Sequence, residues 1–342
     1  MSNRPHTWTG LAIGAGLFGC AVMVAARKRR NSFRGQTVII TGGSRGLGLE
    51  MARRWGAEGA RVVICARTAA DIRRAVCELR NRGFDAHGFQ CDVTTPQSIK
   101  QFIAEVANRF GRIDVLVNNA GIIQVGPRSS MTDKDYQTAM DTHFWGPLHM
   151  IEAVLPHMLR RRRGRIVNIS SIGGKISVPH LLPYSASKFA LVGLSEGLGA
   201  ELAQLGIQVT TVCPGLMRTG SPRNAMFKGQ HRKEYTWFSL GAATPAITIS
   251  SHRAAAQIVE ACRQGRSHLA VSTPAKIAIR WHALFPELFA SALQIMNEFL
   301  PKDGQGPNAR QNHKGKHSFT AISPSPLTWL NEKAAVANNE IR

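Results

Sequence analysis

Residues 37–48 of the chain have the sequence TVIITGGSRGLG, and the fold is organised around this stretch. Residues 37–40 are β-branched, which favours a buried strand, and a helix is expected over residues 49–57 after the turn. Glycines in such a turn allow a tight bend and let backbone N–H groups approach a pyrophosphate at the helix N-terminus. This order predicts a dinucleotide site. The residues expected to form it are Gly42, Ser44, Arg45, Gly46, Leu47 and Gly48.

The end of the second strand indicates which dinucleotide binds. Residues 61–65 are expected to form this strand, which is followed by Ala66 and Arg67. An acidic residue at this point would hydrogen-bond to the ribose 2′-hydroxyl of NAD(H), and none is present. Arg45 and Arg67 instead offer cations for a 2′-phosphate, which favours NADP(H) over NAD(H). The alternative is that both are surface arginines in an arginine-rich protein.

Strand and helix patterns alternate through the following residues. Helices are expected over residues 69–82, 96–110 and 133–163, and strands over residues 86–91, 113–117 and 164–171. This alternation predicts an α/β fold, a Rossmann-type doubly wound parallel sheet in a single catalytic domain. Ligands of such sheets bind at the carboxyl ends of the strands, where the motifs of this sequence lie.

Tyr184 and Lys188 are four residues apart, on one face of an expected helix. A phenol with a pKa of about 10 is a poor acid or base at neutral pH. A nearby ammonium group favours the phenolate and lowers that pKa, which would make Tyr184 a general acid/base. Taken alone, the pair would more simply be interpreted as a solvated helix face.

Five motifs in order resemble those of the short-chain dehydrogenase/reductase family. They are TGxxxGxG at residues 41–48, NNAG at residues 118–121, Ser171, YxxxK at residues 184–188, and Pro214-Gly215. The similarity extends over about residues 35–271. It implies an oxidoreductase in which hydride passes between a nicotinamide and a carbonyl or secondary alcohol.

The resemblance also implies individual roles. Tyr184 would be the general acid/base, Lys188 would lower its pKa and hold the nicotinamide ribose, and Ser171 would position the substrate oxygen. Asn118 would stabilise the sheet beneath the cofactor. The remaining cofactor contacts would come from Asp92, Val93, Ala120, Gly121, Pro214, Gly215 and Thr219.

His143 departs from the family pattern. Many members carry a catalytic asparagine at this point of the long helix, where the helix kinks and a water links the lysine to solvent. A histidine could keep that relay through its backbone carbonyl, supply a titratable nitrogen of its own, or mark lost activity. We include His143 among the expected catalytic residues.

The composition indicates which kinds of binding partner are expected and which are not. The chain has 342 residues, with 43 Lys and Arg against 21 Asp and Glu, for a net charge of +22. Such a charge suggests contact with an anionic surface, cofactor or substrate. No nucleic-acid-binding motif is present, so no nucleic-acid partner is expected. The six cysteines form no CxxC pair, so neither a metal site nor a disulfide framework is expected, and a reducing compartment is favoured.

Residues 1–30 contain an expected transmembrane anchor and a basic flank. Residues 8–26 carry no charge, and Arg27-Lys28-Arg29-Arg30 follows them. A spanning helix needs roughly 20 apolar residues. The alternatives are a signal peptide, whose charges would precede the apolar stretch, and a buried helix of the domain. The basic cluster would place the catalytic domain in the cytoplasm.

The domains expected after the anchor are a catalytic domain over residues 35–272, an apolar helical extension over residues 273–300, broken at Pro286, and a largely disordered tail over residues 301–342. Residues 215–251 mix aromatic and cationic residues and are expected to cover the substrate. The two long helices, residues 133–163 and 183–206, could pair subunits into a homodimer or homotetramer.

The sequence therefore predicts a membrane-anchored, NADP(H)-dependent oxidoreductase that acts on the carbonyl or secondary alcohol of a lipophilic small molecule. The alternative is a non-catalytic, membrane-bound dinucleotide sensor or scaffold, which His143 and the basic tail favour.

Overall fold

A seven-stranded parallel sheet forms the centre of the molecule. The computed structural model describes residues 32–304 and 307–341. The strand order is β11-β7-β6-β4-β1-β2-β3, and every neighbouring pair is parallel. The strands are β1 (Thr37–Thr41), β2 (Arg61–Ala66), β3 (Ala86–Gln90), β4 (Val115–Asn118), β6 (Gly164–Ile169), β7 (Ile207–Pro214) and β11 (His268–Val271). The predicted doubly wound α/β sheet is confirmed.

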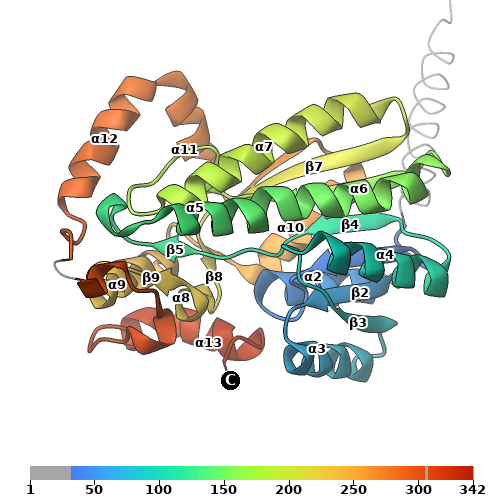
Figure 1. The fold of residues 1–342 in the computed structure, drawn as a ribbon, viewed down its shortest axis with the longest axis horizontal. Coiled ribbons are helices and arrows are strands. Elements are labelled where there is room, and N and C mark those ends of the chain that lie inside the picture. The colour runs from blue at the N-terminus through green and yellow to red at the C-terminus, as the bar shows by residue number, and fades with distance from the viewer. Residues whose placement is uncertain (1–31, 305–306, 342) are drawn as a thin grey trace, which may run out of the picture.

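Helices cover both faces of the sheet (Figure 1). Because successive strand side chains point to opposite faces, Val38 and Ile40 pack in one core while Ile39 packs in the other. The first core includes side chains of α2 (Gly46–Ala57), α3 (Ala69–Asn81) and α10 (Ser251–Gln264). The second includes side chains of α4 (Pro96–Phe110), α6 (Gly146–Leu159) and α7 (Leu182–Ala203).

The long helix expected over residues 133–163 is interrupted. The chain forms α5 (Asp133–Met140), a π-helical turn η2 (Asp141–Trp145) and then α6. The N–H of Gly146 bonds to the carbonyl of Asp141, five residues back. Pro147 has no N–H, so it cannot bond to the carbonyl of His143. The glycine-proline pair therefore accounts for the widened turn, which contains His143.

A smaller layer lies beyond the carboxyl ends of the strands. It contains β8 (Met217–Arg218), α8 (Ser221–Asn224), β9 (Met226–Phe227), α9 (His231–Ala243) and β10 (Ile249–Ser250). Its two small sheets have the orders β10-β8 and β12-β9-β5, with β5 at Gln124–Val125 and β12 at His313–Lys314. Phe227 and Tyr235 are fully buried in its own apolar cluster.

Two helices project from the body at the upper left of Figure 1, α11 (Thr273–Leu284) and α12 (Pro286–Glu298). The chain breaks between them at Phe285, before Pro286. No residue of α12 is buried. Large apolar side chains stand exposed on this hairpin, among them Leu284 at 70% and Phe299, just after α12, at 84%.

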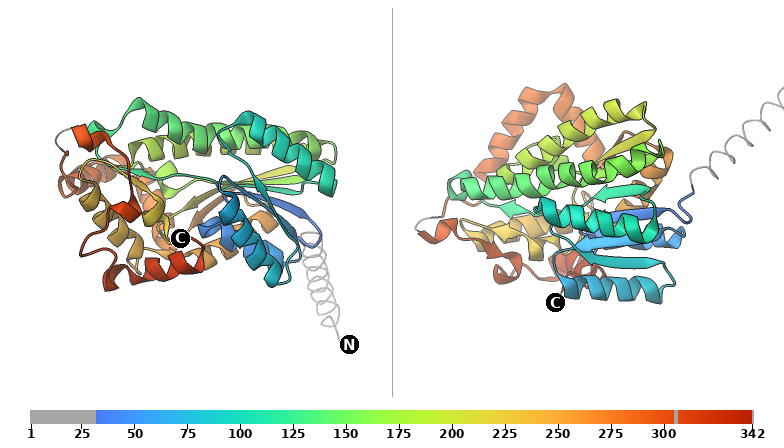
Figure 2. Two further views of the ribbon diagram at one scale, coloured as in Figure 1. Left: turned by 60° about the horizontal axis from the view of Figure 1, so that its bottom comes forward. Right: turned by 45° about the vertical axis from the view of Figure 1, so that its right-hand side comes forward.

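The C-terminal residues differ from the predicted disordered tail. Residues 307–341 form three short 3₁₀ turns, η4 (Pro307–Arg310), η5 (Gly315–His317) and η6 (Pro326–Thr328), together with β12 and helix α13 (Trp329–Ala337). Figure 2 shows this segment along the body. Composition predicts disorder because large apolar residues are few. The segment is ordered nevertheless, because polar contacts hold it against the body. One example is the side chain of Asn331, which donates to the carbonyl of Ser239 at 3.1 Å.

The expected membrane anchor, residues 1–30, lies outside the described residues. Within residues 32–304 and 307–341, no helix is both long enough and apolar enough to cross a membrane.

Candidate active site

The carboxyl ends of β1 and β4 are joined by hydrogen bonds through Thr41. Its hydroxyl accepts from the backbone N–H of Asn119 at 2.9 Å and of Ala120 at 3.0 Å. The side-chain amide of Asn119 donates to the Thr41 carbonyl at 3.0 Å. These contacts place the NNAG residues beside the glycine-rich turn, as expected of a single ligand-binding edge.

A buried chain of polar groups continues across the next two strands. The Asn118 amide donates to Asn168 at 2.9 Å, and the Asn168 amide donates to Ser195 of α7 at 3.0 Å. Thr211 of β7 donates to the same Ser195 hydroxyl at 2.7 Å. Buried hydrogen bonds of this kind fix strand ends relative to one another. The sheet-stabilising role that the resemblance implies for Asn118 stays a prediction, and the side-chain oxygen of Asn118 has no hydrogen-bond partner among the described residues.

Ser171 and Tyr184 come together at the end of β6. Ser171 begins the short turn η3 (Ile172–Gly174), where its hydroxyl accepts from the N–H of Gly173 at 3.0 Å. The same hydroxyl hydrogen-bonds with the phenol of Tyr184. A Cβ on Gly173 would lie only 3.1 Å from the Tyr184 ring, so this glycine allows the close approach.

Lys188 lies beneath the tyrosine, one helical turn further along α7. Its Nζ donates to the carbonyl of Ile169 at 2.9 Å and lies 5.8 Å from the centre of the Tyr184 ring. Burial lowers the pKa of Lys188 to about 7. Burial also raises the pKa of Tyr184, while the hydrogen bond with Ser171 acts to lower it. In this arrangement the Lys188 amino group is turned toward Ile169, and the lowering of the tyrosine pKa by Lys188 that the resemblance implies stays a prediction.

His143 is buried in the π-helical turn η2, and both of its ring nitrogens are hydrogen-bonded. Its Nε2 accepts from the N–H of Ile122 at 3.1 Å, and its Nδ1 lies 2.7 Å from the Ser187 hydroxyl. The Ile122 contact requires an unprotonated Nε2, so the neutral ring carries its proton on Nδ1 and donates to Ser187. Ser187 in turn donates to the Tyr184 carbonyl at 2.8 Å. Burial, followed by the charge of Lys188, holds the pKa of His143 well below its usual value.

The glycine-rich turn fits the pyrophosphate of a dinucleotide. Gly42 and Gly46 have φ values of +64° and +57°, and a Cβ on Gly48 would lie 2.3 Å from the Gly42 carbonyl oxygen. No side chain caps the first turn of α2, and that turn contains no acidic residue. The first turn of this helix therefore has neither a side-chain cap nor an acidic residue of its own, and its bare backbone suits the binding of phosphate.

Arg45 and Arg67 are held differently. Arg45 precedes α2 and donates to the side chain of Asn224 at 2.9 Å, which ties the turn to the smaller layer beyond the strand ends. Arg67 is exposed at the end of β2, where an acidic residue would select NAD(H). At the end of β3, Asp92 accepts from the backbone and hydroxyl of Thr94 and is followed by the buried Val93.

The residues expected beside the nicotinamide follow β7. Pro214 ends the strand, and the N–H of Gly215 donates to the Val271 carbonyl at 3.2 Å. Thr219 is buried, and its hydroxyl lies 2.6 Å from that of Ser221.

Sequence reasoning missed three residues of this edge: Thr41, Ser187 and Glu340. Thr41 is the first residue of the TGxxxGxG motif, where its side chain was given no role, and Ser187 lies at a position that the YxxxK pattern leaves unspecified. Glu340, near the C-terminus, accepts from the N–H of Gly220 at 2.6 Å, and no motif indicates it.

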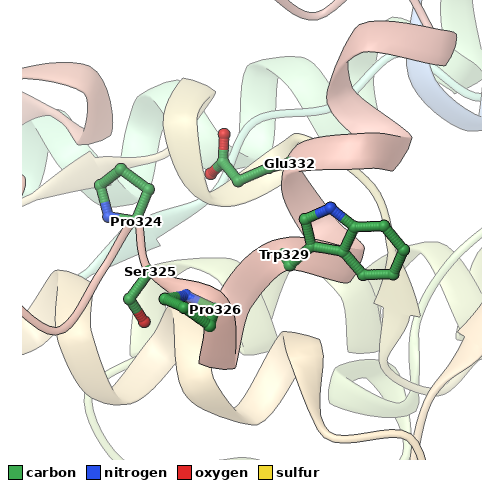
Figure 3. Close-up of a pocket in the computed structure, with 5 residues that line it drawn as sticks. All are labelled: Pro324, Ser325, Pro326, Trp329 and Glu332. Atoms are coloured by element: carbon green, nitrogen blue, oxygen red, sulfur yellow. The ribbon is translucent and has the colours of Figure 1, made fainter.

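A hollow on the surface of the C-terminal segment is lined by Pro324, Ser325, Pro326, Trp329 and Glu332 (Figure 3). None of these residues belongs to the site above. Among the described residues there is no cluster of His, Cys, Asp and Glu that could hold a metal ion.

The comparisons with known proteins agree with this geometry. The model of the family described as short chain dehydrogenase matches residues 36–227. The bovine protein named dehydrogenase/reductase SDR family member 7B is 33% identical over 311 residues, which cover 89% of this chain and 90% of the bovine one.

Two solved structures are also similar. A short-chain dehydrogenase from Streptomyces avermitilis has a TM-score of 0.67 and 31% identity, covering 77% of this chain and 98% of its own. The F189W actinorhodin polyketide ketoreductase with NADPH has a TM-score of 0.62 and 35% identity, covering 69% of this chain and 95% of its own.

Proposed function

Because this chain belongs to the short-chain dehydrogenase/reductase family, we propose that it is an NADP(H)-dependent reductase of a carbonyl group on a lipophilic small molecule. The observation that carries the proposal is the contact of Ser171 with Tyr184 above Lys188, at the same sheet edge as the glycine-rich turn, which has no side-chain cap. An oxidoreductase needs these two half-sites side by side, because proton and hydride reach neighbouring atoms of the substrate.

NADPH, when bound, supplies the hydride to the carbonyl carbon. Tyr184 donates its phenolic proton to the carbonyl oxygen, so that a C=O group becomes CH–OH. The Ser171 hydroxyl, which already contacts the phenol, donates a hydrogen bond to the same oxygen and holds it in place. Turning the Lys188 ammonium from Ile169 toward the phenol would stabilise the phenolate that remains.

The cofactor would lie along the carboxyl ends of β1, β2 and β4. The turn at residues 42–48 would hold the pyrophosphate, Arg67 and Arg45 the 2′-phosphate, and Asp92 and Val93 the adenine. The preference for NADP(H) is supported by the absence of an acidic residue at the end of β2 and by the NADPH in the similar ketoreductase.

The lipophilic substrate and the membrane are proposals that rest on apolar surface. The α11–α12 hairpin exposes Trp281 at 52% and Leu288 at 63%, and the aromatic cluster around Tyr235 lies in the layer over the site. Solvent exposure of several large apolar side chains on one projection is typical of an interaction surface. Together with the apolar residues 8–26, it supports a membrane-anchored enzyme whose catalytic domain faces the cytoplasm.

The test is turnover by the full-length protein with NADPH and a panel of hydrophobic aldehydes and ketones, for the wild type and Tyr184→Phe. The variant keeps the ring and loses the proton donor, so kcat/KM should fall roughly 10²–10⁴-fold while NADPH binding is retained. Tyr136→Phe, which removes a phenol from α5, is the matched control and should be unaffected.

Two results would contradict the proposal. Turnover that survives in Tyr184→Phe would exclude the assigned acid. NADPH binding without turnover of any carbonyl or alcohol would favour the alternative sensor, for which the fully hydrogen-bonded His143 in place of asparagine is the supporting observation.

A further inference from the structure

Residues 338–340, near the end of the described chain, lie on the glycine-rich turn. Helix α13 packs against α9, and the chain then passes α2 and α3 to its described end, beside the C label of Figure 1. The N–H of Gly46, the first residue of α2, donates to the carbonyl of Asn338 at 2.9 Å. The first turn of α2 is therefore capped by a residue almost 300 positions away, in place of a cap of its own.

Asn339 and Glu340 extend this contact over the turn. The Asn339 side chain donates to the carbonyl of Ser44 at 2.9 Å. The Glu340 carboxyl accepts from the N–H of Gly220 at 2.6 Å, and one of its oxygens lies 3.4 Å from the point where a Cβ of Gly46 would be. Only 9% of Glu340 is exposed. Its carboxyl thus fills the space between the glycine-rich turn and the segment after Thr219.

This is the space that the proposed function assigns to a pyrophosphate. The N-terminus of a helix attracts an anion through its free N–H groups and its dipole. Glu340 brings an acidic group there, and the Asn338 carbonyl takes the N–H of Gly46. A dinucleotide and residues 338–340 cannot occupy the same groups at once.

The contacts that hold the segment suit reversible release. Arg53 of α2 donates to the carbonyl of Ala337 at 2.7 Å and to the Asn338 side chain at 3.0 Å, and Arg74 of α3 donates to Asn339 at 2.9 Å. Residues 338–340 bring no apolar side chain to these contacts, which are polar. Segments with few buried apolar contacts open at low free-energy cost.

We propose that residues 338–340 are an autoinhibitory strap that occupies the pyrophosphate site and must leave before NADPH binds. This inference rests on the proposed function. Anything that draws the C-terminal segment away would activate the enzyme by raising its apparent affinity for the cofactor. A site that is free only a fraction of the time binds with an affinity reduced by that fraction.

The test compares the dissociation constant of NADPH for the full-length wild type and for Glu340→Ala, by NADPH fluorescence. Glu340→Ala should bind NADPH about tenfold more tightly or better, the gain expected if the strap is docked at least nine-tenths of the time. Asn339→Ala should act in the same direction, since it removes the bond to Ser44 and places alanine at a φ of +57°. Glu105→Ala, on exposed α4 surface, is the matched control and should not change binding.

Hydrogen exchange provides a second readout that does not depend on turnover. Saturating NADPH should increase exchange of the backbone amides of residues 338–341 in the wild type. Equal NADPH affinity of all variants, or weaker binding by Glu340→Ala, would overturn the strap and leave the proposed function intact. No NADPH binding by any variant, including those with the strap loosened, would refute the proposed cofactor and the strap together.

Discussion

His143 is the residue at which this chain leaves the family pattern, and its surroundings give it a positioning role. The neutral ring connects Ile122 to Ser187, which bonds to the backbone of Tyr184. The motifs identified Ser171, Tyr184 and Lys188 from sequence because their spacing reflects strand ends and one helix face. The hydrogen bond between His143 and Ser187 could not be predicted from sequence, since it depends on how the π-helical turn is oriented toward α7.

The first prediction at this scale concerns stability. His143→Ala removes two buried hydrogen bonds and should lower the free energy of unfolding at pH 7.5 by about 1–3 kcal/mol. The pKa of His143 lies well below 6.5 in the folded protein, so the unfolded chain takes up a proton first as the pH falls. The stability that neutral His143 contributes is therefore present above about pH 6.5 and decreases below it.

Urea unfolding of the wild type and His143→Ala from pH 7.5 to 5 checks this, and the difference between them should narrow as the pH falls. His252→Ala, at a side chain that is 73% exposed, is the control. A difference that stays constant would show that folding leaves the pKa of His143 unchanged, and one that grows toward acid pH would show that the folded protein favours the charged ring.

The second residue-scale prediction concerns cofactor choice. Arg67→Ala should weaken NADPH binding about tenfold or more and leave NADH binding unchanged, because a charge-assisted bond to the 2′-phosphate is lost. Arg109→Ala, an exposed arginine of α4, is the control for bulk charge. If NADPH and NADH lose binding affinity equally, Arg67 does not contact the 2′-phosphate.

At the scale of elements, the sequence predicted which segments are strands and helices but not the interruption within one of them. Hydrophobic periodicity runs through residues 133–163, so it indicates one helix. The break depends on two residues, Gly146 and Pro147, and on a five-residue hydrogen bond that periodicity does not report. The division between α11 and α12 was predictable, because proline ends a helix at the residue before it.

The α11–α12 hairpin carries the third prediction. Leu284→Ser combined with Phe299→Ser should change the free energy of unfolding by no more than about 0.5 kcal/mol, because both side chains are largely exposed. If the hairpin receives lipophilic substrate, KM for a long-chain carbonyl should rise while KM for a small, water-soluble carbonyl stays the same. Leu205→Ser, after α7, is the control. An equal rise in KM for both substrates would show that the substitutions disturb the active site and not the entry of lipophilic substrate.

At the scale of the whole molecule, the doubly wound parallel sheet followed from the alternating pattern, but the course of the C-terminal segment did not. Residues 301–342 lack periodicity and large apolar clusters, which is why disorder was expected. The order of residues 307–341 comes from polar contacts with α2, α3 and the segment after β7, such as Arg223 to Glu332. Because such contacts join residues more than 100 positions apart, no local sequence pattern indicates them.

The fourth prediction concerns the pH dependence of the contact between the strap and the glycine-rich turn. Burial raises the pKa of Glu340 to about 7 from a usual 4.5, although the N–H of Gly220 and the charge of Arg45 act to lower it. Arg74, from α3, bonds to the adjacent Asn339. The docked strap therefore holds a proton that the released strap gives up. Docking should strengthen as the pH falls from about 7 toward 4.5 and should be weakest above 7.

The measurement is the NADPH dissociation constant of the wild type and Glu340→Gln between pH 5.5 and 8, expressed as a ratio so that titration of the 2′-phosphate cancels. The neutral glutamine keeps an oxygen for the N–H of Gly220, so its strap should stay docked at every pH. The wild type should match the variant at pH 5.5 and bind NADPH more tightly than the variant as the pH rises toward 8. A ratio independent of pH would mean that Glu340 does not change its protonation when the strap leaves, and that cofactor entry is not coupled to the acidity of the site.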